Sequence, residues 1–329
     1  MELLHSLEIC AGAGGQALGL ECAGFEHVAA VEIEAAACAT LLLNRPRWNV
    51  LNQDVRELSG RDYRGLDLFA GGVPCPPFSV AGRQLGEKDD RDLFPHALQL
   101  IEDAKPRAVI LENVPGLATA KFSEYREAVR ARLEKLGYRV VWQPLNACNF
   151  GVPQLRPRFV LVALRGAAAA HFEWPNPIGS PPTVGEALID LMAARGWKGA
   201  TTWAARANAI GPTLVGGSKL HGGPDLGPSR AKAAWSLLGV NGGGIADAAP
   251  ESDFPVDAMP KLTVRMAARI QGFPDSWQIS GRKTAAYRQI GNAFPPPVAE
   301  AVGRAVRAAL VGATLKKEEK PSQQKRVVF

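Results

Sequence analysis

Residues 3–33 read LLHSLEICAGAGGQALGLECAGFEHVAAVEI, two short apolar runs separated by a glycine-rich turn and a helix-like segment. Leu3–Ile9 and His27–Ile33 have the composition of strands, and Gln16–Ala23 between them has the pattern of a helix. A strand, a helix and a second strand in this order are typical of parallel strands joined by a crossover helix. This stretch therefore predicts an α/β fold.

The same alternation continues along the first half of the chain. Helices are expected at Ala35–Leu43 and Leu93–Glu102, and apolar strands at Leu66–Phe69 and Ala108–Leu111. We therefore expect a Rossmann-like, mostly parallel sheet that is covered by helices on both faces. Ligands of such sheets bind at the carboxyl ends of the strands, and the motifs described below all lie at such ends.

The bulk properties fit a protein with a sizeable core. With 329 residues and 47% hydrophobic content, the chain is long enough for two domains. No apolar run approaches the roughly 18 residues of a membrane span, and no secretory signal is visible, so we expect a cytoplasmic protein. The five cysteines include no pair spaced two or four residues apart, so we expect neither a metal site nor a disulfide framework. The net charge of +6 is compatible with a polyanionic partner but is weak evidence for one.

A change in composition divides the chain. From His171 to Pro260 it is rich in Gly, Pro and Trp, and its periodicity is poor, whereas helical patterns return at Leu262–Ile270 and Pro297–Leu310. The predicted organisation is a sheet domain, a smaller loop-rich domain, a return segment that completes the first domain and a flexible, charged tail. These four parts span residues 1–170, 171–261, 262–314 and 315–329.

Three features at successive strand ends predict a site for a cofactor that contains adenosine. The glycine turn that follows the first strand allows close approach of a ligand. Glu32 ends the second strand, where a carboxylate can bind both hydroxyls of a ribose, and Asp54 follows the third, where it can accept from an adenine amino group. The alternatives are a turn that serves only helix–strand packing and two solvated loop charges.

A second group of residues has the chemistry of a reaction centre. Cys75 stands in the sequence PCPPFS, residues 74–79, whose prolines restrict the backbone around the thiol. Glu112 closes an apolar strand, where a carboxyl group must pair or stay protonated. Arg156 and Arg158 alternate, so in an extended strand both guanidinium groups share one face and can grip a phosphate or a pyrimidine carbonyl. A buried structural cysteine, a helix-terminal charge and surface salt bridges are the alternatives.

Taken together, these pieces resemble the bacterial cytosine-5 DNA methyltransferases, whose motifs occur in this order. The glycine turn resembles the first motif, Pro74-Cys75 the catalytic one, and Glu112-Asn113-Val114 and Gln154-x-Arg156-x-Arg158 the two around the target base. Residues 262–274 and 289–296 resemble the ninth and tenth motifs. Two departures are Cys10, where the family often has an aromatic residue, and Met266, which replaces a usual glutamate.

The resemblance implies S-adenosylmethionine as cofactor, duplex DNA as substrate and a monomer that acts beside a separate restriction endonuclease. The implied catalytic residues are Cys75, Glu112, Arg156 and Arg158. The implied cofactor-binding residues are Cys10, Ala11, Gly12, Gly14, Gly15, Glu32, Ile33, Asp54, Val55, Pro74, Leu93, Asn292 and Ala293. The implied DNA-binding residues are Ser79, Gln154, Arg206, Lys219, His221 and Arg230.

The resemblance also assigns the loop-rich segment to target recognition. Residues 171–260 carry six Lys and Arg against eight Asp and Glu, yet the basic residues gather within 195–232 and four acidic residues follow them. We expect residues 195–232 to face DNA, with Thr213–Gly223 as a base-reading loop. Ser79–Asp92 is expected to close over a base that has been flipped out of the duplex.

Three other functions compete with DNA methylation. A tRNA cytosine methyltransferase of the same superfamily could share every catalytic motif. A nicotinamide-dependent dehydrogenase would account for the glycine turn and Glu32, but it leaves Cys75 and Glu112 without a role. A non-catalytic DNA-binding relative is disfavoured because both of these residues are present.

Overall fold

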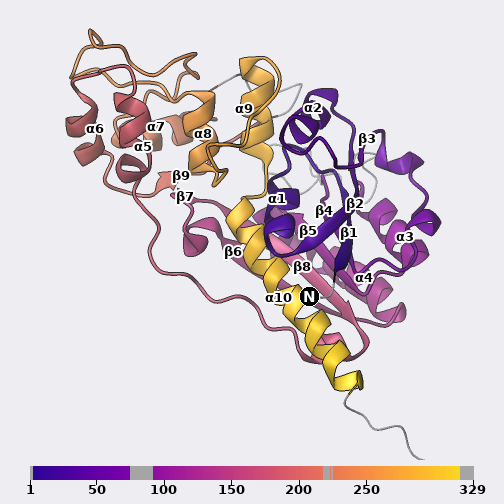
Figure 1. Ribbon diagram of the computed structural model, residues 1–329. Helices are drawn as coiled ribbons and strands as arrows, with labels where there is room; N and C mark the ends of the chain where they lie inside the picture. Colours follow the sequence, from indigo (N-terminus) through magenta and orange to yellow (C-terminus); the bar gives the residue numbers. More distant parts are fainter. Residues whose placement is uncertain (1–2, 75–91, 218–222, 224, 319–329) are drawn as a thin grey trace, which may run out of the picture.

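The computed structural model describes residues 3–74, 92–217, 223 and 225–318, and its centre is a seven-stranded sheet (Figure 1). Five strands pair in parallel in the order β3-β2-β1-β4-β5, and β8 continues the sheet antiparallel to both β5 and β6. The bounds are β1 (Leu4–Ile9), β2 (Phe25–Glu32), β3 (Val50–Asn52), β4 (Leu68–Gly72), β5 (Ala108–Asn113), β6 (Tyr138–Asn146) and β8 (Pro157–Arg165). The predicted Rossmann-like, mostly parallel sheet is confirmed.

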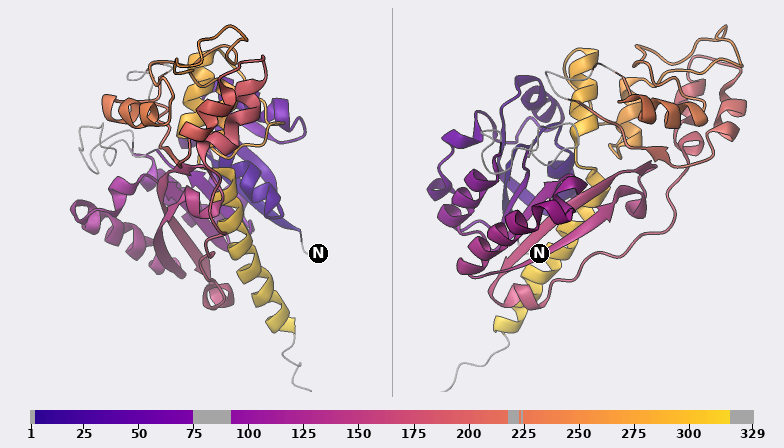
Figure 2. Two further views of the ribbon diagram at one scale, coloured as in Figure 1. Left: turned by 90° about the vertical axis from the view of Figure 1, so that its left-hand side faces the viewer. Right: turned by 180° about the vertical axis from the view of Figure 1, so that it is seen from behind.

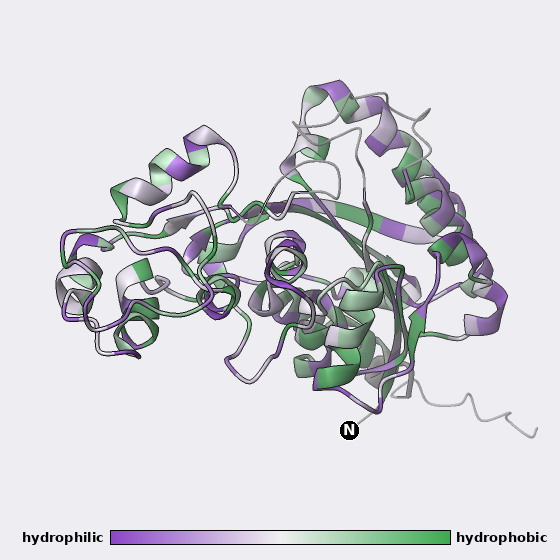
Figure 3. Ribbon diagram, turned by 90° about the horizontal axis from the view of Figure 1, so that it is seen from above, coloured by the Kyte–Doolittle hydropathy of each residue, from purple (hydrophilic) through white to green (hydrophobic). Residues whose placement is uncertain are grey.

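Helices cover both faces of this sheet because its strands are apolar on both sides. Along β5, Val109 and Leu111 pack into one core with α3 and α4, whereas Ala108 and Ile110 pack into the other with α1 and α10. Figure 3 shows hydrophobic residues in green where the helices meet the sheet. The covering helices are α1 (Gly15–Cys22), α3 (Phe94–Ala104), α4 (Ser123–Lys135) and α10 (Pro296–Glu318).

A second lobe of short helices lies to one side of the sheet (Figure 2). Its core contains several tryptophans and joins the helices to the return segment. The sequence predicted only loops over most of this region, because its helices are short and Gly-rich turns interrupt their periodicity. Its elements are α5 (Val184–Ala193), α6 (Ala200–Arg206), α7 (Ser229–Leu237), α8 (Val264–Ile270) and a two-stranded parallel sheet of β7 (Gln154–Leu155) and β9 (Gly211–Pro212).

The chain then returns to the first lobe through α9 (Lys283–Asn292), beside α2 (Ala35–Asn44), and ends in α10. Helix α10 packs so closely on α1 that a Cβ atom on Gly19 would lie 2.5 Å from the Pro296 carbonyl oxygen and from the Ala299 Cβ atom. The last helix is therefore an integral layer of the sheet lobe. Within the described ranges, no helix combines the length and apolar character that a membrane span requires.

Gly19→Ala tests this helix contact. The added methyl group meets backbone atoms that cannot rotate away, so we expect the free energy of unfolding to fall by about 1–3 kcal/mol. Gly312→Ala, on the open part of α10 where a Cβ atom meets nothing within 4 Å, should instead be neutral or stabilising by up to about 1 kcal/mol. Urea unfolding of both variants provides the measurement, and equal effects would refute the close packing.

Candidate active site

A cavity of about 580 Å³ lies at the carboxyl ends of the parallel strands. Its walls come from β1, β2, β4 and β5, from the turn after β3 and from the end of α9. Twelve of the thirteen residues expected at a cofactor line it: Cys10, Ala11, Gly12, Gly15, Glu32, Ile33, Asp54, Val55, Pro74, Leu93, Asn292 and Ala293. The volume is within the range of about 300–1,000 Å³ that is typical of small-molecule sites.

The exception is Gly14, which holds the turn in shape from outside the cavity. It is the N-terminal cap of α1 with a φ of +81°, and a Cβ atom there would lie 2.5 Å from the Leu41 side chain and 2.9 Å from the ring of Trp277 in the return segment. Gly15 is also required by packing, since its Cβ atom would lie 2.1 Å from the Phe294 carbonyl oxygen. Both glycines therefore bring the return segment and the turn together, in addition to any approach of a ligand.

Glu32 is bound by the turn that it faces. One carboxylate oxygen accepts from the Gly12 amide at 2.7 Å and the other from the Glu34 amide at 2.8 Å. Burial raises the pKa of Glu32, and these two amides oppose the rise. The carboxylate is thus fixed in place, with lone pairs left to accept from a ligand hydroxyl.

Asp54 lies at the far end of the cavity and is more open to solvent. Its carboxylate accepts from the Arg56 backbone amide at 2.9 Å and forms an ion pair of 2.5 Å with the Arg56 guanidinium group. These contacts lower the pKa of Asp54 to about 2. The group is therefore ionised at neutral pH and can accept from an amino group.

At the opposite end, Glu112 and Arg158 form a buried ion pair with Nε and Oε1 2.5 Å apart. Glu112 is the last residue but one of β5 and pairs with Gly72 of β4. Gly72 precedes Cys75 by three residues in the sequence. Burial lowers the pKa of Arg158, and the Glu112 carboxylate counteracts this effect. The sequence led us to expect that Glu112 either pairs with a cation or stays protonated. In the structure it pairs with Arg158.

Asn113 holds the chain where it leaves β4 towards Cys75. Its side-chain amide donates to the Val73 carbonyl oxygen at 3.0 Å, and its own oxygen accepts from the Val114 amide at 2.8 Å. Pro74, the next residue, lines the cavity. Cys75 itself lies outside the described residues, as do Ser79, Lys219 and His221.

The sequence matches the family of C-5 cytosine-specific DNA methylases over residues 4–215 and 239–308. It is 58% identical over 314 residues to the Type II methyltransferase M.NaeI of Lentzea aerocolonigenes, with 94% of this chain and 76% of that protein aligned. The chain belongs to this family. The methyltransferase is also 53% identical over 313 residues to the Type II methyltransferase M.NgoMIV of Neisseria gonorrhoeae, with 93% of this chain and 97% of that protein aligned.

The fold is similar to that of solved methyltransferase structures. DNMT2 of Spodoptera frugiperda matches with a TM-score of 0.63 at 18% identity, over 93% of this chain and 99% of that one. The protein is thus a DNA cytosine-5 methyltransferase, and the dehydrogenase interpretation is set aside.

The structure of the methyltransferase places Arg156 differently from the sequence prediction. The chain changes sheets at this residue, since β7 ends at Leu155 and β8 begins at Pro157. Arg156 is fully buried and donates to the carbonyl oxygens of Leu214 at 2.8 Å, Gly291 at 2.6 Å and Ala293 at 3.1 Å. It therefore joins the recognition segment to the return segment, while Arg158 alone reaches Glu112.

Gln154 is likewise placed inside the protein and not on a surface that DNA could reach. Its amide nitrogen donates to the Ile270 carbonyl at 3.2 Å and to the Gln271 side chain at 2.8 Å, and its oxygen accepts from the Leu214 amide at 2.8 Å. Its relative exposure is 0%. In the structure, Gln154 and Arg156 therefore join the recognition segment to the return segment.

The expected separation of charge in the recognition segment is only partly present in space. Arg206 and Arg230 are exposed, as a DNA contact requires. Arg195, however, forms an ion pair of 2.8 Å with Glu251 in the acidic stretch, because residues 195–196 bridge to Glu251. Lys232 pairs with Asp225 at 2.9 Å. Separation along the sequence does not keep these two stretches apart once the lobe folds.

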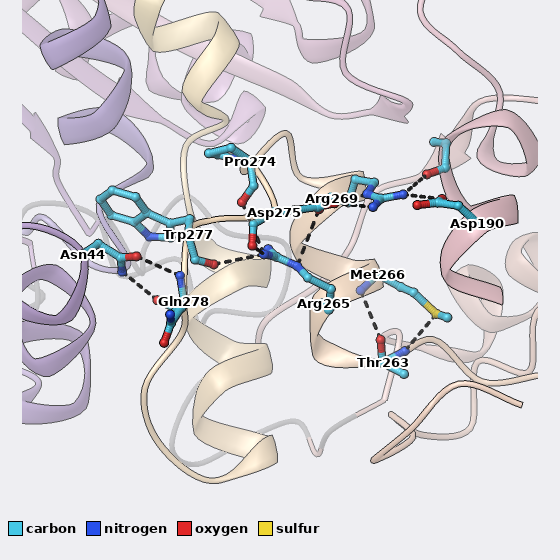
Figure 4. A network of polar contacts seen from close by, with 11 residues as sticks. Asn44, Asp190, Thr263, Arg265, Met266, Arg269, Pro274, Asp275, Trp277 and Gln278 are labelled. Carbon is cyan, nitrogen blue, oxygen red and sulfur yellow. Dashed lines mark hydrogen bonds and ion pairs between the residues drawn. The ribbon is translucent and has the colours of Figure 1, made fainter. Parts of the chain in front are cut away.

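The ninth motif is part of a polar network that links α8 to α5 and reaches Asn44 of α2, in the sheet lobe, through Gln278 (Figure 4). Arg269 of α8 pairs with Asp190 of α5 at 2.5 Å, and it also pairs with Asp275. Met266 stands where the family usually has a glutamate, and its sulfur accepts from the Thr263 amide at 3.4 Å. The N-terminal cap of α8 is therefore retained, with a thioether sulfur as the acceptor. Arg269 supplies the ionic link between α8 and α5.

Several residues that line the cavity were not identified from the sequence, among them Glu8 of β1, Gln16 of α1 and Arg288 of α9. Glu8 lies within an apolar strand and Gln16 within the first turn of a helix, positions that usually serve packing. A charged residue inside a strand with apolar neighbours is the one signal that could have drawn attention to Glu8.

Arg156→Gln tests the buried cross-link. Three carbonyl oxygens lose their donor, so we expect the free energy of unfolding to fall by about 3 kcal/mol or more. The same substitution at Arg206, which is exposed and makes one contact of 3.2 Å to the Ser236 carbonyl oxygen, should change stability by less than about 0.5 kcal/mol. Similar urea midpoints for the two variants would contradict the role given to Arg156.

Proposed function

We propose that this methyltransferase transfers a methyl group from S-adenosylmethionine to carbon 5 of a cytosine flipped out of duplex DNA, through a covalent adduct with Cys75. The observation that carries the proposal is the order of groups along one sheet edge. Asp54 follows β3, Glu32 ends β2, and Glu112 is the last residue but one of β5, beside the strand that leads to Cys75. All three carboxyl groups line one cavity.

The residues of the cavity fit such a cofactor. A carboxylate that is fixed by two backbone amides can accept from ribose hydroxyls, and the ionised Asp54 can accept from the adenine amino group. Ile33 lies at the cavity with 59% of its surface exposed, so an adenine ring could cover it. Bound there, S-adenosylmethionine would supply an electrophilic methyl group near the β4–β5 end.

The nucleophile is needed because carbon 5 of cytosine is unreactive on its own. The Cys75 thiolate adds to carbon 6, which makes carbon 5 enamine-like and able to accept the methyl group. A base then removes the proton from carbon 5, and the thiolate leaves. Free cysteine has a pKa of about 8.5, so the pocket must favour the ionised thiol.

Glu112 controls the electron density of the ring during this addition. In the proposed complex a proton is shared between the Glu112 carboxyl group and ring nitrogen 3, and this proton neutralises the charge that the thiolate pushes into the ring. Arg158 holds this carboxyl group in place at 2.5 Å and keeps a positive charge close to the reaction centre. Asn113 fixes the Val73 carbonyl and with it the backbone that leads to Cys75.

The biological setting is proposed from the relatives. M.NaeI and M.NgoMIV are Type II methyltransferases, and we propose that this chain modifies a specific duplex site beside a separate restriction endonuclease. Residues 171–261 are proposed as the recognition domain that reads the site. Ser79–Asp92, most of which lies outside the described residues, is proposed to close over the flipped base.

Cys75→Ser should abolish methyl transfer, because a hydroxyl group is a far weaker nucleophile towards carbon 6. Radiolabelled methyl transfer to duplex DNA measures the loss, with tRNA as the comparison acceptor. The wild-type protein should form a covalent complex with DNA that carries 5-fluorocytosine, since fluorine blocks the final elimination. Undiminished turnover in the Ser variant would show that Cys75 is not the nucleophile.

Arg230→Ala and Lys198→Ala test the DNA face of the recognition domain. Both side chains are exposed, so each should weaken binding to all duplexes alike and reduce the log–log salt slope by about 0.9 per lost phosphate contact. Lys232→Ala should have a smaller effect because Asp225 already pairs with that lysine. Asp253→Ala, on the exposed acidic stretch, is the control, and weaker binding by this variant alone would reverse the assignment.

A further inference from the structure

The stretch that leads into the expected base-reading loop is held by residues outside the recognition domain. The Leu214 carbonyl oxygen accepts from Arg156 at 2.8 Å, and the Leu214 amide donates to the Gln154 side chain at 2.8 Å. The Gly217 carbonyl oxygen accepts from the Asn292 side chain at 3.1 Å. The sheet domain and the return segment therefore fix the backbone at the start of this loop.

Two glycines bring the backbone of this stretch into direct contact with the end of α9. A Cβ atom on Gly291 would lie 2.4 Å from the Gly216 amide nitrogen. A Cβ atom on Gly216 would lie 2.6 Å from the Asn292 Oδ1 atom and 2.7 Å from the Arg288 carbonyl oxygen. Neither glycine has a positive φ, so neither is required for its backbone conformation. Both are required for space, because any side chain would push the stretch and the helix apart by about 1 Å.

The chain that follows the loop returns beside the same stretch. A Cβ atom on Gly227 would lie 3.1 Å from the Cβ atom of Val215, and the neighbouring Leu226 is fully buried, with its amide donating to the Gly242 carbonyl oxygen at 3.0 Å. Both segments that flank the loop thus depend on where the end of α9 holds Gly216.

A displacement of this size matters more for reading bases than for holding DNA. Hydrogen bonds to base edges require donor and acceptor atoms about 2.7–3.2 Å apart, so a shift of about 1 Å breaks them. Contacts to the phosphate backbone carry no sequence information and come from many parts of a DNA-binding protein. Neither Gly216 nor Gly291 is among the residues that line the cofactor cavity, so the contact has no part in the mechanism above.

We propose that the contact between Gly216 and Gly291, together with the hydrogen bond from Asn292 to Gly217, sets the position from which the recognition domain reads its DNA site. The inference rests on the proposed function. Gly291 and Asn292 are then specificity-determining positioning residues that lie outside the recognition domain and touch no base. Gly291 stands within α9, where glycine is a poor helix former, and the contact with Gly216 accounts for its presence there.

Gly216→Ala and Gly291→Ala test the contact, since each adds one methyl group to it. Each variant methylates a pool of duplex DNA of randomised sequence at saturating S-adenosylmethionine, and bisulfite sequencing identifies the methylated cytosines with their flanking bases. The measured ratio compares methylation of the preferred sequence with that of sequences in which one base differs. We expect both variants to lower this ratio about tenfold at one or more positions. Because all sequences compete in one reaction, a change in cofactor affinity alters total methylation and not the ratio.

Gly312→Ala is the matched control, because it also replaces a helical glycine but its Cβ atom meets nothing within 4 Å. It should leave the ratio within about twofold of the wild-type value. Lower total methylation with an unchanged ratio in Gly216→Ala and Gly291→Ala would give the contact a structural role only and overturn the proposal. An equal fall of the ratio in Gly312→Ala would overturn it as well.

Two further measurements keep the proposal testable. If the alanine variants do not fold, Asn292→Ala removes the hydrogen bond to Gly217 without adding volume and should lower the ratio about threefold; an unchanged ratio would refute the role of this bond. If a variant folds but is inactive, sequencing of the duplexes that it retains in a gel replaces the methylation readout, with the same expectation. A wild-type protein that methylates no cytosine in the pool would instead refute the proposed function itself.

Discussion

Five strands of the central sheet run in one direction, so their carboxyl ends meet at one edge. This constraint places Asp54, Glu32, Glu8 and Glu112 along a single cavity, although they are spread over a hundred residues of the chain. The strand order β3-β2-β1-β4-β5 then fixes the order of the groups. For the proposed reaction, that order runs from the nucleoside of the cofactor to the target base.

The cavity is completed by segments that arrive from far along the chain. Gly15 allows the Phe294 carbonyl to approach the turn, and Gly19 allows α10 to lie against α1. Arg156 joins the recognition segment to the return segment by donating to three carbonyl oxygens. Because Asn292 lines the cavity and its side chain donates to the Gly217 carbonyl at 3.1 Å, the cavity wall also contacts the base of the glycine-rich recognition loop.

Local patterns in the sequence predicted the sheet and most of the cavity, because each strand carries its own apolar signal and each motif follows a strand end. They failed where orientation depends on a partner distant in sequence. The direction of Arg156 is decided by a change of sheet, and Gln154 is buried by Gln271 and Leu214. Arg195 pairs with Glu251 only after the second lobe has folded. Glu8 was missed because a sequence does not show that a residue inside an apolar strand lines a cavity.

The position of residues 288–294 in the sequence determines when the cavity can close during synthesis. These residues form one wall of the cavity, and α10, which anchors them on α1, ends the described fold. During synthesis the glycine turn and all strands of the central sheet leave the ribosome before this wall does. A chain that stops before residue 288 lacks one wall of the cavity, so the cavity can close only after the recognition segment has been made.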